Sequence, residues 1–133
     1  MDAAHALREL TELSTQIESA VVLRADGAVL ASTLEDPARE AALASSTLEL
    51  MAAAFALNAQ PREVTRVEVE LENGGFFALR DGGRTIAATT KPQPTSGLVV
   101  YDLRTCLEGI TEPNRKRAKR PPVRMPDTET ETE

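Results

Sequence analysis

The chain has 133 residues, of which 41% are hydrophobic and 27% are charged, and a net charge of −6. This size and composition are typical of one globular domain and leave little room for a second. No run approaches the roughly 18 apolar residues that span a bilayer, and the amino terminus lacks the pattern of a secretory signal. With a single cysteine besides, we expect a cytoplasmic protein without membrane insertion.

Charge is distributed unevenly along the chain. Residues 1–112 carry 9 basic and 17 acidic side chains, residues 113–124 carry 6 basic and no acidic ones, and residues 125–133 add 4 acids. Too few apolar side chains follow Pro113 to offset the entropy of ordering that segment. We therefore predict a domain over residues 1–112 and a disordered charged tail over residues 113–133.

In the first half of the chain, the spacing predicts two helices around a hairpin. Leu7, Leu10, Leu13 and Ile17 recur at helical intervals, which predicts a helix over about residues 3–16. Residues 20–23 and 28–33 are short apolar strands joined by an Asp-Gly turn, and the first, apolar on both faces, should be central in the sheet. An Asp-Pro pair at 36–37 then begins a helix that ends near residue 58.

The second half predicts a three-stranded meander and a last helix. Valine or leucine alternates with glutamate over residues 67–72, the pattern of a strand with one buried and one solvent-exposed face. Glycine-rich turns connect it to strands at 76–80 and 84–90. Residues 98–110 return to helical spacing, so we predict an α/β (α+β) domain with five antiparallel strands and the order α-β-β-α-β-β-β-α.

The long middle helix is more apolar than packing on its own sheet requires. A helix packed on a sheet needs an apolar arc of only about 100°, whereas two stripes here give an arc near 180°. One stripe can cover the sheet, and the other then needs either the remaining two helices or a second protein surface. We favour a partner. The two stripes consist of Leu43, Thr47, Leu50, Ala54 and Leu57, and of Ala44, Leu48, Met51 and Phe55.

The hairpin at residues 17–32 and the Ser96-Gly97-Leu98 start of the last helix resemble the corresponding parts of the Roadblock/dynein light-chain family. The resemblance covers about residues 3–111 and rests on the order of the elements and on the residue pattern of the hairpin. It implies a sheet with the middle helix on one face and the other two helices on the opposite face. It also implies a homodimer that pairs the middle helices and joins the following strand across a two-fold axis.

For function, the resemblance implies a non-catalytic scaffold or regulator of a Ras-like small GTPase, of the kind found in bacteria, or a dynein light chain. The partner would be a second copy and a GTPase, whose hydrolysis some members raise by remodelling the GTPase's own residues. The strand that would cross the two-fold axis bears glutamates, which would repel one another across it unless arginines compensate. The expected interface consists of Leu43, Thr47, Leu48, Leu50, Met51, Ala54, Phe55, Leu57, Arg66, Glu68 and Glu70.

Residues that carry catalytic or cofactor chemistry are sparse. The chain lacks the Gly-x-x-x-x-Gly-Lys-Ser/Thr loop that cradles phosphates, so we expect a regulator and not a GTPase. His5 has no histidine or cysteine neighbour and is expected to be a solvated surface residue, since zinc needs three or four ligands. Cys106 is expected to pack as a small hydrophobic residue on the inner face of the last helix. We predict no cofactor, metal or catalytic residue.

Two other functions remain open. A PAS-like or profilin-like sensory module would bind a small molecule, although few polar groups converge on a pocket and few aromatics could line one. An adaptor would use the basic run at 115–120 to bind nucleic acid or an anionic surface. Because no aromatic residue accompanies that run for base stacking, we favour a solubilising tail and regard nucleic acid as a poor candidate.

Overall fold

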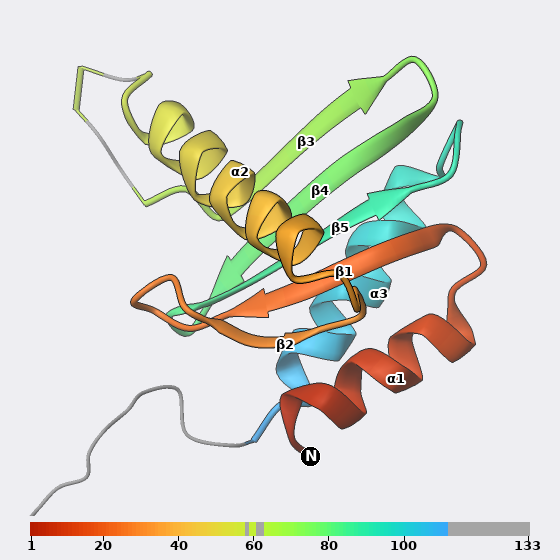
Figure 1. Ribbon diagram of the computed structural model, residues 1–133. Helices are drawn as coiled ribbons and strands as arrows, with labels where there is room; N and C mark the ends of the chain where they lie inside the picture. Colours follow the sequence, from red (N-terminus) through yellow and green to blue (C-terminus); the bar gives the residue numbers. More distant parts are fainter. Residues whose placement is uncertain (58, 61–62, 112–133) are drawn as a thin grey trace, which may run out of the picture.

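The structure is a computed structural model that describes residues 1–57, 59–60 and 63–111. The predicted tail at 113–133 lies outside the described residues. The elements follow the predicted order, and the architecture is a five-stranded antiparallel sheet with three helices (Figure 1). They are α1 (Ala3–Leu13), β1 (Ile17–Leu23), β2 (Val29–Ser32), α2 (Pro37–Phe55), β3 (Arg66–Leu71), β4 (Gly74–Asp81), β5 (Arg84–Thr90) and α3 (Ser96–Glu108).

The strands lie in the order β2-β1-β5-β4-β3, and every neighbouring pair is antiparallel. β1 lies inside the sheet between β2 and β5, as its apolar sequence predicts. Its residues Ala20 to Leu23 are completely buried, which requires cover on both faces of the sheet. β2 and β3 are the two edge strands.

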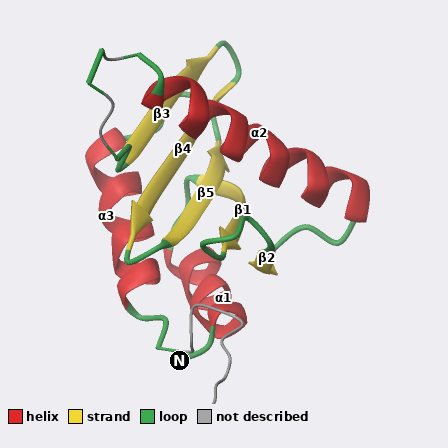
Figure 2. Ribbon diagram, turned by 90° about the vertical axis from the view of Figure 1, so that its left-hand side faces the viewer, coloured by secondary structure: helices red, strands yellow, loops and turns green. Residues whose placement is uncertain are grey.

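Helices cover the two faces unequally. α1 and α3 lie side by side on one face, and α2 crosses the other alone (Figures 1 and 2). One core cluster joins α1 and α3 to the sheet through residues such as Leu103 and Ile86. The second cluster lies under α2 and joins Ala44 and Met51 to Val21 and Phe76. The helix arrangement implied by the family resemblance is therefore present.

Local chemistry explains where the helices begin. Asp36 accepts a hydrogen bond from the backbone N–H of Ala38 at 2.9 Å, and Pro37 occupies the first helical position of α2. Asp2 caps α1 in the same manner, accepting from the N–H of His5 at 2.8 Å. Both caps satisfy N–H groups that have no partner inside a helix.

The end of α1 differs from the prediction. The helix ends at Leu13 and not near residue 16, and Leu13 is 80% exposed. The Ser14 hydroxyl accepts hydrogen bonds from the N–H groups of Gln16 and Ile17, which turns the chain out of the helix. Ile17 then begins β1, so its helical spacing from Leu7, Leu10 and Leu13 did not reflect a helical position.

The turn from β3 to β4 requires a glycine because another strand's backbone lies against it. A Cβ added at Gly74 would lie 2.5 Å from the carbonyl oxygen of Thr90 in β5. We expect Gly74→Ala to lower the free energy of unfolding by about 1 to 3 kcal/mol, the usual cost of overpacking, as measured by urea denaturation.

Gly97→Ala is the matched control, because nothing lies within 4 Å of an added Cβ there and the residue is helical. It should raise stability by about 0.5 to 1 kcal/mol through helix propensity. Equal stability of the two variants would show that the backbone of β5 does not constrain this turn.

Candidate partner-binding surface

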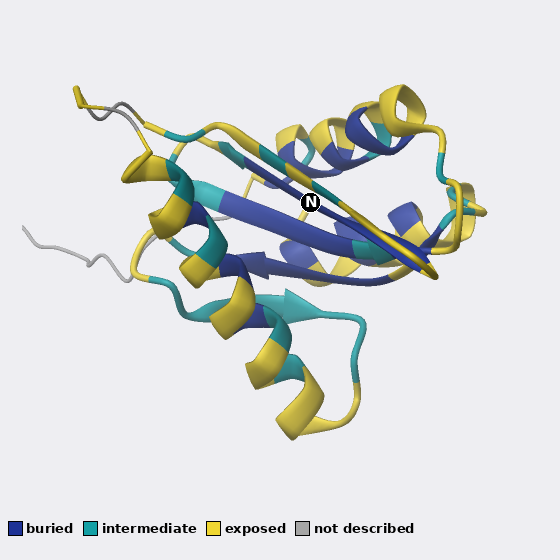
Figure 3. Cartoon of the chain, turned by 90° about the horizontal axis from the view of Figure 1, so that it is seen from above, coloured by how far each residue is buried: buried dark blue, intermediate teal, exposed yellow. Residues whose placement is uncertain are grey.

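The outer part of α2 and the turn that follows it carry large apolar side chains that the sheet does not cover. Phe55 is 46% exposed, Leu57 is 82% exposed and Leu48 is 38% exposed. Figure 3 shows the contrast between this exposed helix and the buried strands beneath it. Exposed apolar side chains grouped on one element of a small domain are typical of a contact surface.

The line along which α2 contacts the sheet runs between the two predicted stripes. Ala44, Thr47 and Met51 are the buried residues of the helix. Thr47 is completely buried and its hydroxyl donates to the carbonyl of Leu43 at 2.8 Å. Met51 is 3% exposed. Two residues expected at a partner interface, Thr47 and Met51, are thus covered by the domain's own sheet.

The other predicted helix residues flank this line. Leu43 and Leu50 are half-buried against the second core cluster, together with Val67 and Val69 of β3. Ala54 is half-buried as well. On the opposite flank, a Cβ added to Gly27 in the β1–β2 turn would lie 3.0 Å from Leu48. The middle of the apolar arc is therefore buried against the sheet, and both flanks remain partly or fully exposed to solvent.

The alternative that α1 and α3 cover the second stripe does not fit the described residues. α2 contacts β1, β3 and β5, whereas α1 and α3 pack on each other and on the opposite face of the sheet (Figure 2). The exposed flanks of α2 are thus left without cover by these helices.

β3 has the predicted alternation over Arg66 to Glu70 and lies at a sheet edge, but Leu71, expected on the buried face, is 50% exposed. Arg66, Glu68 and Glu70 are exposed, whereas Val67 and Val69 are half-buried. The Nε of Arg66 lies 3.1 Å from a carboxylate oxygen of Glu68, so the two form an ion pair along the strand. The predicted strand face is therefore solvated, but one of its charges is already balanced within the chain.

Hydrogen bonding determines which backbone groups of β3 face outward. Arg80 donates its N–H to the carbonyl of Thr65 at 2.9 Å, and residues 66 and 79 are the next aligned pair. Because hydrogen-bonded and non-hydrogen-bonded pairs alternate in an antiparallel ladder, residues 66, 68 and 70 direct their N–H and C=O groups away from β4. This edge can accept another strand.

The surface formed by α2 and β3 therefore combines the apolar flanks of the helix with a strand edge. We call this the α2–β3 surface, defined by Leu43, Leu48, Leu50, Ala54, Phe55 and Leu57 of the helix and its adjacent loop, and by Arg66, Glu68 and Glu70 of β3. Such a surface has the chemistry of protein recognition. In the part of the chain that the structure describes, no group of three or more His, Cys, Asp or Glu side chains could hold a metal ion.

The two residues considered for chemistry occupy ordinary positions. His5 is on the surface of α1, where its Nε2 lies 3.4 Å from the Glu9 carboxylate. Cys106 is buried in the core formed with α1 and α3. Burial, followed by the negative charge of Glu9, raises the pKa of the Cys106 thiol to about 11. The thiol is protonated at neutral pH, so it lacks the thiolate that nucleophilic catalysis needs.

Comparison with known proteins agrees with this fold. Residues 4–91 match the Roadblock/LC7 domain family. The chain belongs to this family, which is in general a non-enzymatic adaptor and regulator fold. No curated protein matches the chain by sequence.

Solved structures with the same fold are distant in sequence. A Roadblock/LC7 domain from Streptomyces avermitilis has a TM-score of 0.72 at 20% identity, covering 81% of this chain and 93% of that one. The gliding protein MglB from Thermus thermophilus has a TM-score of 0.67 at 18% identity, with 80% and 83% covered. A structure described as MglB with a tetrameric arrangement has a TM-score of 0.68 at 18% identity, with 81% and 84% covered.

Within the described residues, none of the helices has the length and apolarity that crossing a membrane requires.

Because Cys106 is the only cysteine, alkylation of the whole protein reports on this one thiol. We expect iodoacetamide to react about 100-fold more slowly with the folded chain than with the urea-unfolded chain at about pH 8, because folding raises the thiol pKa from 9.0 to about 11. Mass spectrometry of timed samples measures the two rates. The same shift lowers the free energy of unfolding as the pH rises from the ordinary thiol pKa of 9.0 to about 11, because the unfolded thiol ionises first. Similar alkylation rates in the two states would mean that the thiol is open to solvent.

Proposed function

We propose that this protein is a homodimeric, non-catalytic regulator of a Ras-like small GTPase. The observations that carry the proposal are the uncovered apolar flanks of α2 and the open edge of β3. Family membership supports it, and so does the likeness to an MglB structure with a tetrameric arrangement. The missing phosphate loop makes the GTPase a separate protein.

The dimer buries the α2–β3 surface against its copy. Burying apolar area contributes roughly 25 cal/mol per Å², and Leu57, Leu71 and Phe55 are large apolar side chains exposed on α2, its following turn and β3. In a two-fold arrangement the same patch serves both copies, so one exposed helix flank covers another. The strand edges then extend the two sheets into one.

The charges on β3 permit such pairing in one register. A two-fold axis at Val67 keeps the outward backbone groups of residues 66 and 68 in hydrogen-bonded pairs. Arg66 then lies opposite Glu68 of the second copy, and this pair occurs twice across the axis. Opposite charges on facing strands stabilise the ladder, so the repulsion expected from the glutamates is replaced by attraction in this register.

Phe55→Glu tests the dimer. Placing a carboxylate in a buried apolar interface without a partner is costly, so we expect the variant to be monomeric at concentrations where the parent chain is dimeric. Light scattering coupled to size-exclusion chromatography gives the mass, and circular dichroism verifies that the monomer is folded.

Leu98→Glu is the matched control. Leu98 is 49% exposed, close to Phe55, but belongs to α3 on the opposite face. It should leave the dimer mass unchanged. A parent chain that is strictly monomeric, or a Phe55→Glu variant that remains dimeric, would contradict the proposed interface.

The regulatory role is tested with small GTPases of the same organism. We expect one of them to bind the chain more tightly in its GTP state than in its GDP state, measured by calorimetry with non-hydrolysable nucleotide. Phe55→Glu should weaken this binding by about tenfold or more, because in this proposal the GTPase binds the dimer and the variant is monomeric. The chain alone should release no phosphate from GTP. Absence of binding to any of these GTPases would overturn the regulatory role while leaving the dimer untouched.

A further inference from the structure

A groove runs between α1 and α3, on the face of the molecule opposite α2. Its volume is about 340 Å³, and its lining includes Leu10, Leu13, Tyr101 and Cys106. Leu13 is 80% exposed and Tyr101 is 66% exposed, so the apolar wall is open to solvent. Leu13 and Tyr101 line the same groove, and apolar side chains exposed together are typical of a contact surface.

The charged side chains that line this groove are acidic. Glu9 of α1 and Asp102 of α3 both belong to the lining. The negative charge of Glu9 reaches the base of the groove, where it contributes to the raised pKa of the Cys106 thiol. The groove therefore suits a segment that combines basic with apolar side chains, and the Tyr101 ring can also receive a guanidinium group.

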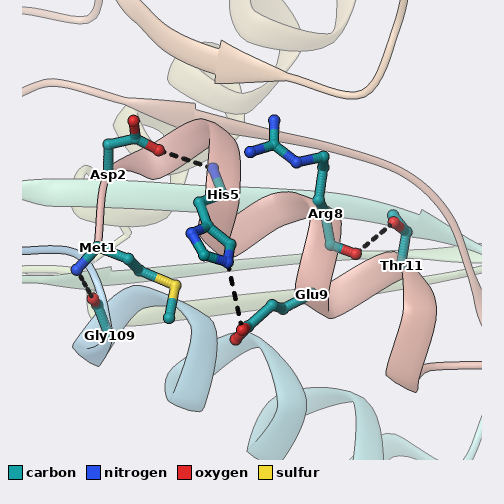
Figure 4. A network of polar contacts seen from close by, with 7 residues as sticks. All are labelled: Met1, Asp2, His5, Arg8, Glu9, Thr11 and Gly109. Carbon is teal, nitrogen blue, oxygen red and sulfur yellow. Dashed lines mark hydrogen bonds and ion pairs between the residues drawn. The ribbon is translucent and has the colours of Figure 1, made fainter.

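The chain itself supplies a segment of this kind beside the groove. Met1 and Gly109 line one end, and the amino group of Met1 donates to the carbonyl of Gly109 at 3.2 Å (Figure 4). The N–H of Thr111 donates to the carbonyl of Met1 at 2.9 Å. The last described residue before the tail is thus held next to the groove.

The sequence that follows has the matching composition. Residues 113–124 contain six basic and no acidic side chains, and Val123-Arg124-Met125 alternates apolar with basic residues. We propose that the groove between α1 and α3 binds the chain's own segment 115–125. The basic run pairs with Glu9 and Asp102, and the apolar side chains cover Leu13 and Tyr101.

Attachment favours the chain's own segment over a separate peptide of the same composition. A short flexible connection holds a tethered ligand at an effective concentration on the order of 1 mM, which suffices for weak binding. Residue 115 follows Thr111 by only four positions, and each extended residue spans about 3.3 Å, so the segment reaches the groove without a long linker. The interaction is electrostatic in part and weakens as salt rises.

The test uses Tyr101 as a reporter. It is the only tyrosine and the chain has no tryptophan, so intrinsic fluorescence excited above the phenylalanine band comes from the groove alone. Acrylamide is an uncharged quencher, and its effect on Tyr101 measures how open the groove is. The full chain is compared with a full-length variant in which the five basic residues of 115–120 are replaced by glutamate.

We expect the quenching constant to rise by up to about tenfold in the glutamate variant, because a segment at about 1 mM effective concentration with a Kd of about 0.1 mM is docked about ten to one. High salt should raise quenching of the parent chain in the same direction. The substitutions lie outside the described residues, and circular dichroism verifies that the fold is retained.

Reversing the charges of the groove gives a second, independent test. Glu9→Lys with Asp102→Lys should open the groove of the parent chain, and combining it with the glutamate tail should restore protection. Glu12→Lys is the matched control, because Glu12 is an exposed acid of α1 outside the groove lining and should change nothing.

Three results would overturn the proposal. Equal quenching in the parent and tail variants would mean that the tail does not cover the groove. Protection that is lost on dilution would mean that the segment comes from a second copy. Protection that survives both tail reversal and salt would mean that no charge pairing is involved. The groove is on the face opposite α2, so failure here leaves the proposed dimer and GTPase partner unaffected.

Discussion

A single helix cannot cover a five-stranded sheet, and much of this molecule follows from that limit. With its side chains an α-helix is about 10 Å wide, whereas five strands about 4.8 Å apart span about 19 Å between the outer axes. α1 and α3 together cover one face, but α2 is alone on the other. Its middle line is buried, both flanks stay open, and the valines of β3 are only half covered. A second copy supplies the missing cover in the dimer that we propose.

The charges on the exposed edge of β3 oppose indiscriminate strand pairing, although the edge can still accept another strand. Charged side chains on an edge strand discourage indiscriminate pairing between molecules, because most registers bring like charges together. In the register that we propose, Arg66 lies opposite Glu68 of the second copy, whereas misaligned registers bring glutamates together. In the dimer that we propose, the alternation in β3 therefore discourages misaligned pairing and favours one register.

Local sequence patterns predicted the elements well because those elements depend on local chemistry. Asp36-Pro37 begins α2 through a cap that needs only neighbouring residues, and the alternation of β3 reflects its one solvated face. The errors arose where distant contacts decide. Ile17 has helical spacing from Leu13, but the Ser14 turn and pairing with Thr90 place it in a strand. Likewise, helix periodicity showed the apolar arc of α2 but not that Thr47 and Met51 lie at its buried centre.

The groove between α1 and α3 could not be predicted from sequence for a related reason. Leu13 and Tyr101 are far apart in the chain, and each alone looks like an ordinary helix residue. Only the packing of the two helices brings them together with Glu9 and Asp102. The strand order could not be predicted for the same reason. β1 pairs with β5, which is more than 60 residues away in the sequence, and no local pattern specifies that partner.

That pairing has a consequence for synthesis on the ribosome. β1 can form a hairpin with β2 as soon as both are synthesised. Its other neighbour, β5, is synthesised much later, since Val21 pairs with Ala87. At about 5 to 20 residues per second, the largely apolar β1 waits several seconds or longer with one edge unpaired. Completing the sheet therefore requires a long-range closure, and a nascent chain stalled before β5 leaves one edge of an apolar strand unpaired.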